Sequence, residues 1–161
     1  MEKVFGATKR DDQLIVFGTK RAILIFGYGE EGGMGYDYRH IFDHIPTDEE
    51  IVSVITEQVN ADTDLKILTG FVWNGKSVWL STENQFNFKA AYDLAVQTGG
   101  ATLPIKFKLG EDEFNKPVHH TFISLEEFTD FYTQAIAFVN ATLVEGWDLK
   151  DSIDLSKFNR Q

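Results

Sequence analysis

One pattern occurs twice in the second half of the chain and restricts its fold more than any other feature. It consists of two extended segments, a hydroxyl residue that caps a helix, and an amphipathic helix. In the first copy, residues 71–73 and 76–80 flank Asn74-Gly75, a pair typical of tight hairpins because a type I′ turn needs positive φ at both positions. Ser81 or Thr82 then caps the helix.

The second copy has the same order. Residues 103–109 and 117–123 form a hairpin around a polar loop that begins at Gly110. Ser124, with a glutamate three residues later, forms a capping box, and the helix ends at Gly146. A helix that follows a hairpin buries its apolar face on that sheet. The sequence therefore predicts an α+β fold, an antiparallel sheet with two hairpin–helix units and the helices packed on one face.

The first third of the chain reads as β-strands. Residues 14–17 and 22–26 are continuously apolar, which suits strands that are covered on both faces or buried in an oligomer. We therefore identify these strands as a docking or oligomerisation region, with candidate contacts at four apolar positions: Leu14, Val16, Ile23 and Ile25. The glycine-rich stretch 27–35 is expected to be a mobile loop or wide turn.

Three segments follow from these boundaries. Residues 1–45 form the N-terminal β segment. Residues 46–153 form the α+β domain, whose first helix begins at a capping box of Thr47 and Glu50 behind Pro46. Residues 154–161 form a tail, and the chain from Asp148 onward is expected to hold one short helical turn and then fray.

The charge balance limits the partners. The chain carries 25 acidic and 15 basic residues, a formal net charge of −10, and this field repels phosphate backbones, so nucleic acid is not an expected partner. Cysteine is absent, which rules out disulfides and thiolate metal sites and fits a reducing cytosol. No apolar run approaches the roughly 20 residues needed to span a bilayer, and the N-terminus lacks the apolar core of a signal peptide.

No constellation of catalytic or metal-binding residues emerges. His40 and His44 are four apart, as metal ligands on a helix would be, but Pro46 argues against a helix there. His119 and His120 point to opposite faces of a strand. A nucleophile motif is missing, and Ser124 is better explained as a helix cap. We therefore expect no enzyme, metal site or cofactor.

The tryptophans on either side of the Asn-Gly turn have two interpretations. Large aromatic side chains dominate protein cores, so the favoured interpretation packs one of them under the following helix while the other partly covers the sheet. In the alternative, an exposed tryptophan forms a contact surface with neighbouring aromatic residues. The candidate contact residues are Trp73, Trp79, Tyr92 and Phe114.

Residues 70–153 resemble a family of domains of unknown function found in phage and prophage proteins, often beside tail-fibre or tail-assembly genes. The likeness lies in residues 79–87, an aromatic followed by a Ser/Thr-rich cap and a helix. It also lies in the strand at 103–107 and in residues 120–128, a strand, cap and helix start. The family has no established catalytic residues to carry over, and residues 1–69 lie outside the likeness.

The resemblance implies a tail-associated structural or assembly protein whose partners are other phage or tail proteins. Such a protein is in the cytoplasm during assembly or part of the virion, and the apolar N-terminal strands add the expectation of a homo-oligomer. The rival function is a small-molecule or glycan-binding module with an aromatic cleft lined by Trp73, Trp79 and Tyr92.

Overall fold

A computed structural model describes residues 1–159 of the chain. The chain divides into two compact units. The first comprises Met1–Asn60 together with the segment from Trp147 onward, and the second comprises Ala61–Gly146. Helices α1 (Asp48–Thr69) and α3 (Leu125–Asp151) each contribute residues to both units.

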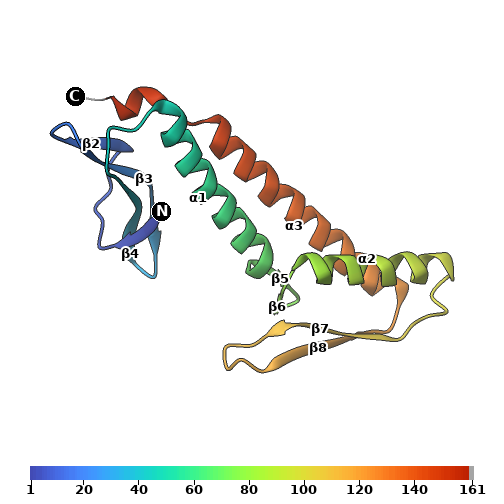
Figure 1. Ribbon diagram of the computed structural model, residues 1–161. Coiled ribbons are helices and arrows are strands. Elements are labelled where there is room, and N and C mark those ends of the chain that lie inside the picture. The colour runs from blue at the N-terminus through green and yellow to red at the C-terminus, as the bar shows by residue number, and fades with distance from the viewer. Residues whose placement is uncertain (160–161) are drawn as a thin grey trace. The chain divides into compact units, whose positions relative to one another are not determined.

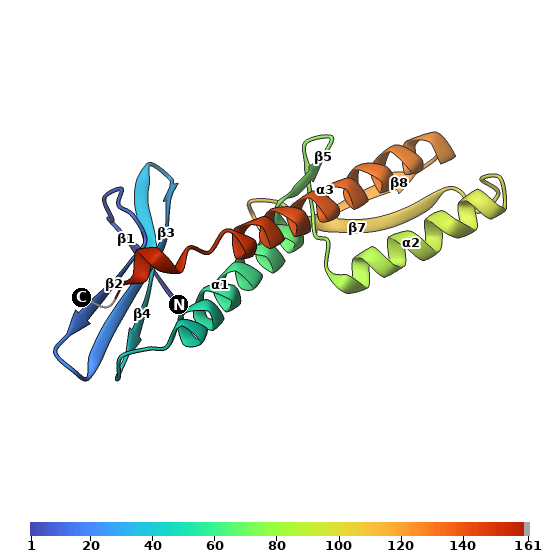
Figure 2. The same cartoon turned by 90° about the horizontal axis from the view of Figure 1, so that it is seen from above.

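The first unit contains a four-stranded antiparallel sheet (Figures 1 and 2), and its strand order is β1-β4-β3-β2. Its strands are β1 (Glu2–Phe5), β2 (Gln13–Phe17), β3 (Arg21–Glu31) and β4 (Met34–Phe42). The expectation of a long glycine-rich loop is wrong, because β3 runs on through Glu31 and β4 begins at Met34. Gly32 and Gly33, both with positive φ, make the tight turn between them.

One face of this sheet, here called the inner face, packs against the start of α1. Leu14 of β2 pairs with Leu24 of β3, and both belong to a buried cluster with Ile51 and Ile55 of α1. The predicted capping box is confirmed: the backbone N–H of Glu50 donates to Oγ1 of Thr47 at 3.2 Å, and the Thr47 N–H donates to Oε2 of Glu50 at 2.7 Å.

The C-terminal segment also contributes to this core. Residues Leu155–Phe158 form a 3-10 helix, η1, capped at its N-terminus by Asp154, whose carboxylate accepts from the Ser156 N–H. The Phe158 ring is only 4% exposed and lies in the cluster beneath the inner face. The short helical turn expected in the tail is therefore present, whereas the expected fraying is wrong through residue 158. Residues 160–161 lie outside the described residues.

The second unit contains both predicted hairpin–helix units. The remaining elements are β5 (Phe71–Trp73), β6 (Lys76–Val78), α2 (Thr82–Gln97), β7 (Ile105–Glu111) and β8 (Pro117–Phe122). The two hairpins adjoin, because the N–H of Trp79 donates to the carbonyl of Leu109 at 2.7 Å. Both α2 and the first half of α3 lie on the same side of the β7–β8 hairpin (Figures 1 and 2). The α+β fold class is confirmed.

Two glycines expected at element ends lie inside elements instead. Gly110 is within β7, at the irregularity in its pairing with β8, and a Cβ there would come 2.9 Å from the carbonyl oxygen of Ser77. Gly146 does not end α3, which continues to Asp151. Glycine occupies these two positions because neighbouring atoms leave no room for a side chain.

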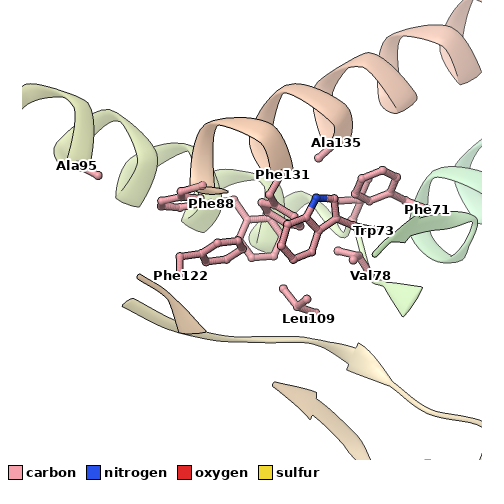
Figure 3. Close-up of a cluster of buried hydrophobic side chains, with 11 residues drawn as sticks. Phe71, Trp73, Val78, Phe88, Ala95, Leu109, Phe122, Phe131 and Ala135 are labelled. Atoms are coloured by element: carbon pink, nitrogen blue, oxygen red, sulfur yellow. The ribbon is translucent and has the colours of Figure 1, made fainter. Parts of the chain in front are cut away.

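The core of the second unit is dominated by aromatic rings, which gather between the hairpins and the two helices (Figure 3). Phe122 of β8 stacks on Phe128 of α3 at a centroid distance of 4.5 Å. Trp73 of β5 meets Phe131 of α3 edge to face at 5.2 Å. Such pairs contribute about 1 kcal/mol each beyond the burial of their area.

Candidate interaction surfaces

The four-stranded sheet has a second face, here called the outer face, formed by the alternate residues of its strands. Ile15, Ile23 and Ile41 lie side by side across β2, β3 and β4, because Ile15 pairs with Ile23 and Ile23 pairs with Ile41. The Ile41 side chain is 55% exposed, and Phe17, two residues beyond Ile15, is 52% exposed. The outer face therefore presents a continuous apolar row.

The outer face is also hollowed. A shallow depression of about 610 Å³ is lined on this face by residues of three strands. They are Glu2, Val4, Ile23, Arg39 and Ile41. An open depression lined by apolar and charged side chains, on a sheet that has already buried its opposite face, is typical of a contact surface.

The four predicted docking residues are divided between the two faces. Leu14 is 8% exposed and belongs, with the partly buried Val16, to the core beneath the inner face. These two side chains therefore pack within the chain instead of docking a partner. Ile23 and Ile25 alternate with the inner-face residues of β3 and so belong to the outer face. Ile25 is only 4% exposed there.

The segment between β1 and β2 is held by a buried ion pair that the sequence analysis missed. Asp37 of β4 is 1% exposed. One of its carboxylate oxygens accepts from both Nε and Nη2 of Arg10, and the other accepts from Nε of Arg39 at 2.7 Å. Burial raises the pKa of the Asp37 carboxyl, but the hydrogen bonds and charges of the two guanidinium groups outweigh it, so the pKa is below its usual value.

The four candidate aromatic residues lie in different environments. Trp73 is 1% exposed and so belongs to the core, while its indole N–H donates to Oδ2 of Asp130 at 2.9 Å. Tyr92 is partly buried and stacks on Tyr132 with the ring centroids 4.5 Å apart. Trp73 is therefore not part of a contact surface, and it does not line an aromatic cleft.

The other two candidates are more accessible. Trp79 is partly buried and has the ammonium group of Lys108 over its ring, 5.2 Å from the centroid. Phe114 is 70% exposed and lies in the turn between β7 and β8. Of the four aromatic residues, Phe114 is therefore the one with a side chain mostly in solvent.

A polar chain crosses three elements of the second unit. Nζ of Lys76 lies 2.8 Å from Nδ1 of His120, and Nε2 of His120 lies 2.9 Å from Oε1 of Glu127. The other carboxylate oxygen of Glu127 accepts from the N–H of Ile123. The His120 ring also packs edge to face on Trp73 at 5.0 Å. These contacts join β6, β8 and α3 around the edge of the core.

His40 and His44, the pair that raised the question of a metal site, have different partners. His40 is on β4 against Phe42, and burial lowers its pKa. His44 bonds to the carboxylates of Asp43 and Glu50, which raise its pKa. Within residues 1–159, no three His, Asp or Glu side chains come together as a metal site. No helix in this range is long and apolar enough to cross a membrane.

Comparison with known proteins identifies a family but no characterised relative. No curated protein and no solved structure matches the chain. Residues 53–159, which include the whole second unit and the C-terminal segment that packs in the core of the first, match the domain of unknown function DUF4376. The match covers about two thirds of the sequence, so the chain belongs to the DUF4376 family.

Proposed function

We propose that the chain is a non-enzymatic, phage or prophage tail-associated protein that acts through protein–protein contacts made by its N-terminal sheet. The observation that carries the proposal is the outer face, where Ile41 and Phe17 are each more than half exposed. A sheet that is apolar on both faces needs a cover on each. Within the first unit, α1 and η1 cover the inner face.

The link to tails rests on the sequence resemblance in residues 70–153 and on the kind of surface that assembly proteins need. The second unit contributes a rigid aromatic core, which supports a scaffold role. The family match begins at residue 53. The whole N-terminal sheet therefore lies outside the matched region. A scaffold inside the family match, joined to a docking sheet outside it, suits a protein that brings partners together.

Deletion of the gene in the strain that encodes the chain tests this function. After induction of the phage or prophage, electron microscopy should show particles with missing or malformed tails. Immunoblotting of purified particles then distinguishes a structural part, which remains in the virion, from an assembly factor, which does not. Particles with normal tails and normal titre after deletion would contradict the proposal.

A further inference from the structure

We propose that the outer face of the N-terminal sheet is the interface between two copies of this chain, packed sheet to sheet about a two-fold axis. This inference names the first partner of the contact surface described above and rests on the proposed function for its biological role. The occupant is a second copy because the charges and the register of the face are self-complementary.

The charge of the outer face differs from that of the rest of the chain. It carries three carboxylates, Glu2, Asp37 and Asp43, and three arginines, Arg21 and Arg39 on the strands and Arg10, which bonds to Asp37. The formal charges on the face therefore cancel, whereas the chain as a whole carries −10. Two copies repel each other over most of their surfaces and meet with least repulsion at this face.

The strand register gives the geometry of the contact. Sheets that pack face to face lie about 10 Å apart with their strands roughly aligned. The two-fold axis lies between the two sheets, parallel to their strands and midway between β3 and β4. Rotation about this axis places β3 of one copy over β4 of the other. Ile23 then lies over the partner subunit's Ile41, its own neighbour in the sheet. Ile23 and Ile41 of the two copies then form one apolar contact, with Ile15 at its edge.

The same axis brings opposite charges together. Ala22 of β3 pairs with Phe42 of β4 at the end of the ladder. The next residues beyond this pair are Arg21 in β3 and Asp43 just after β4. Both are exposed, and the Asp43 side chain is 99% accessible. Arg21 of each copy then lies over the partner subunit's Asp43, which gives two symmetric ion pairs beside the apolar row.

Light scattering after size-exclusion chromatography tests the interface on the full chain, from about 1 to 100 µM, the range that reveals micromolar dimers. The expected mass is twice the 18.3 kDa of the chain. Ile41→Lys should give a monomer, because it buries an unpaired charge in the interface. Val72→Lys, at a 57% exposed position of β5 in the second unit, is the matched control and should remain a dimer.

Charge reversal provides a test that does not depend on the apolar variant. Arg21→Asp and Asp43→Arg should each weaken the dimer about tenfold or more, because each breaks both ion pairs. The double variant Arg21→Asp/Asp43→Arg should restore most of the affinity. Circular dichroism verifies that each variant is folded.

Three results would overturn the interface. They are a wild-type monomer at 100 µM, an oligomer other than a dimer, and a double variant no tighter than the single ones. A monomer that still supports normal tails would overturn this inference alone. A dimer in a strain whose tails form without the gene would overturn the tail function and leave the interface standing.

Discussion

Gly146 of α3 lies directly against Thr63 of α1. A Cβ at position 146 would come 2.5 Å from Oγ1 and 3.3 Å from Cγ2 of that threonine. Glycine in the middle of a helix costs about 1 kcal/mol relative to alanine. The close approach of the two helices within the second unit explains why the chain has a glycine there.

Gly146→Ala should therefore destabilise the protein by about 1 kcal/mol, because overpacking outweighs the gain in helix propensity. Threonine is stiff at χ1 and yields little. In a Thr63→Ala background the same change should be neutral or stabilising. Urea denaturation of the four proteins in this cycle measures the coupling, and a Gly146→Ala protein more stable than wild type would show that the helices separate freely.

The C-terminal 3-10 helix should contribute to the stability of the first unit. Phe158→Ala removes a ring that is 4% exposed and should cost about 3 kcal/mol in the free energy of unfolding. Leu155→Ala, at a position that is 36% exposed in the same helix, is the matched control and should cost under about 1 kcal/mol. Equal effects from the two substitutions would show that Phe158 is not packed in the core.

The buried ion pair should make stability depend on acidic pH. The pKa of Asp37 is lowered in the folded protein, so its contribution is complete above its unfolded pKa near 4 and is lost as the pH falls through the folded value. Asp37→Asn should cost about 2 kcal/mol at pH 7, because Arg10 and Arg39 lose their partner.

The difference between wild type and Asp37→Asn should therefore shrink as the pH falls below about 4. Thermal melting from pH 7 to pH 3 measures this convergence, provided that both proteins still unfold reversibly. A difference that stays constant over the whole range would mean that the carboxylate charge of Asp37 does not stabilise the fold.

The aromatic core predicts a contrast between two phenylalanines of the second unit. Phe131 is fully buried and contacts Trp73, whereas Phe86 on α2 is 71% exposed. Phe131→Ala should cost about 4 kcal/mol, and Phe86→Ala should change the free energy of unfolding by less than about 0.5 kcal/mol. Chemical denaturation measures both values. A small effect at Phe131 would contradict a close-packed core.

Local signals made much of the fold predictable from the sequence. Asn74 and Gly75 have φ values of 48° and 73°, as the hairpin signal requires, because these two residue types adopt positive φ at little cost. The Ser81 hydroxyl accepts from the Asn84 N–H at 3.2 Å, as a helix cap should. Such features depend on residues within one turn of each other, so a single sequence contains the whole cause.

The features that were wrong or missed depend on contacts distant in sequence. The glycines at 27–35 indicate a loop by composition, yet pairing between β3 and β4 places most of this segment in strands. Phe158 is buried only because residues more than a hundred positions earlier form the inner face against which it packs. Asp37 resembles any polar residue of a half-exposed strand, and only the crossing of Arg10 over β4 makes it a buried partner.

The candidate surface could be found only in part. The apolar runs at 14–17 and 22–26 indicated strands covered on two faces. They did not separate Leu14, which belongs to the core, from Ile23, which lines the outer face. Ile41 was missed because it lies among polar and aromatic residues, and only its register opposite Ile23 places it in the apolar row.

Complementation of the gene deletion tests the central claim most directly, because it asks whether the outer face is needed for tail assembly. Wild type and Val72→Lys should restore tailed particles and titre when supplied in trans, and Ile41→Lys should not, although all three proteins accumulate to equal levels. Full rescue by Ile41→Lys would contradict the claim that this chain acts through the outer face of its N-terminal sheet.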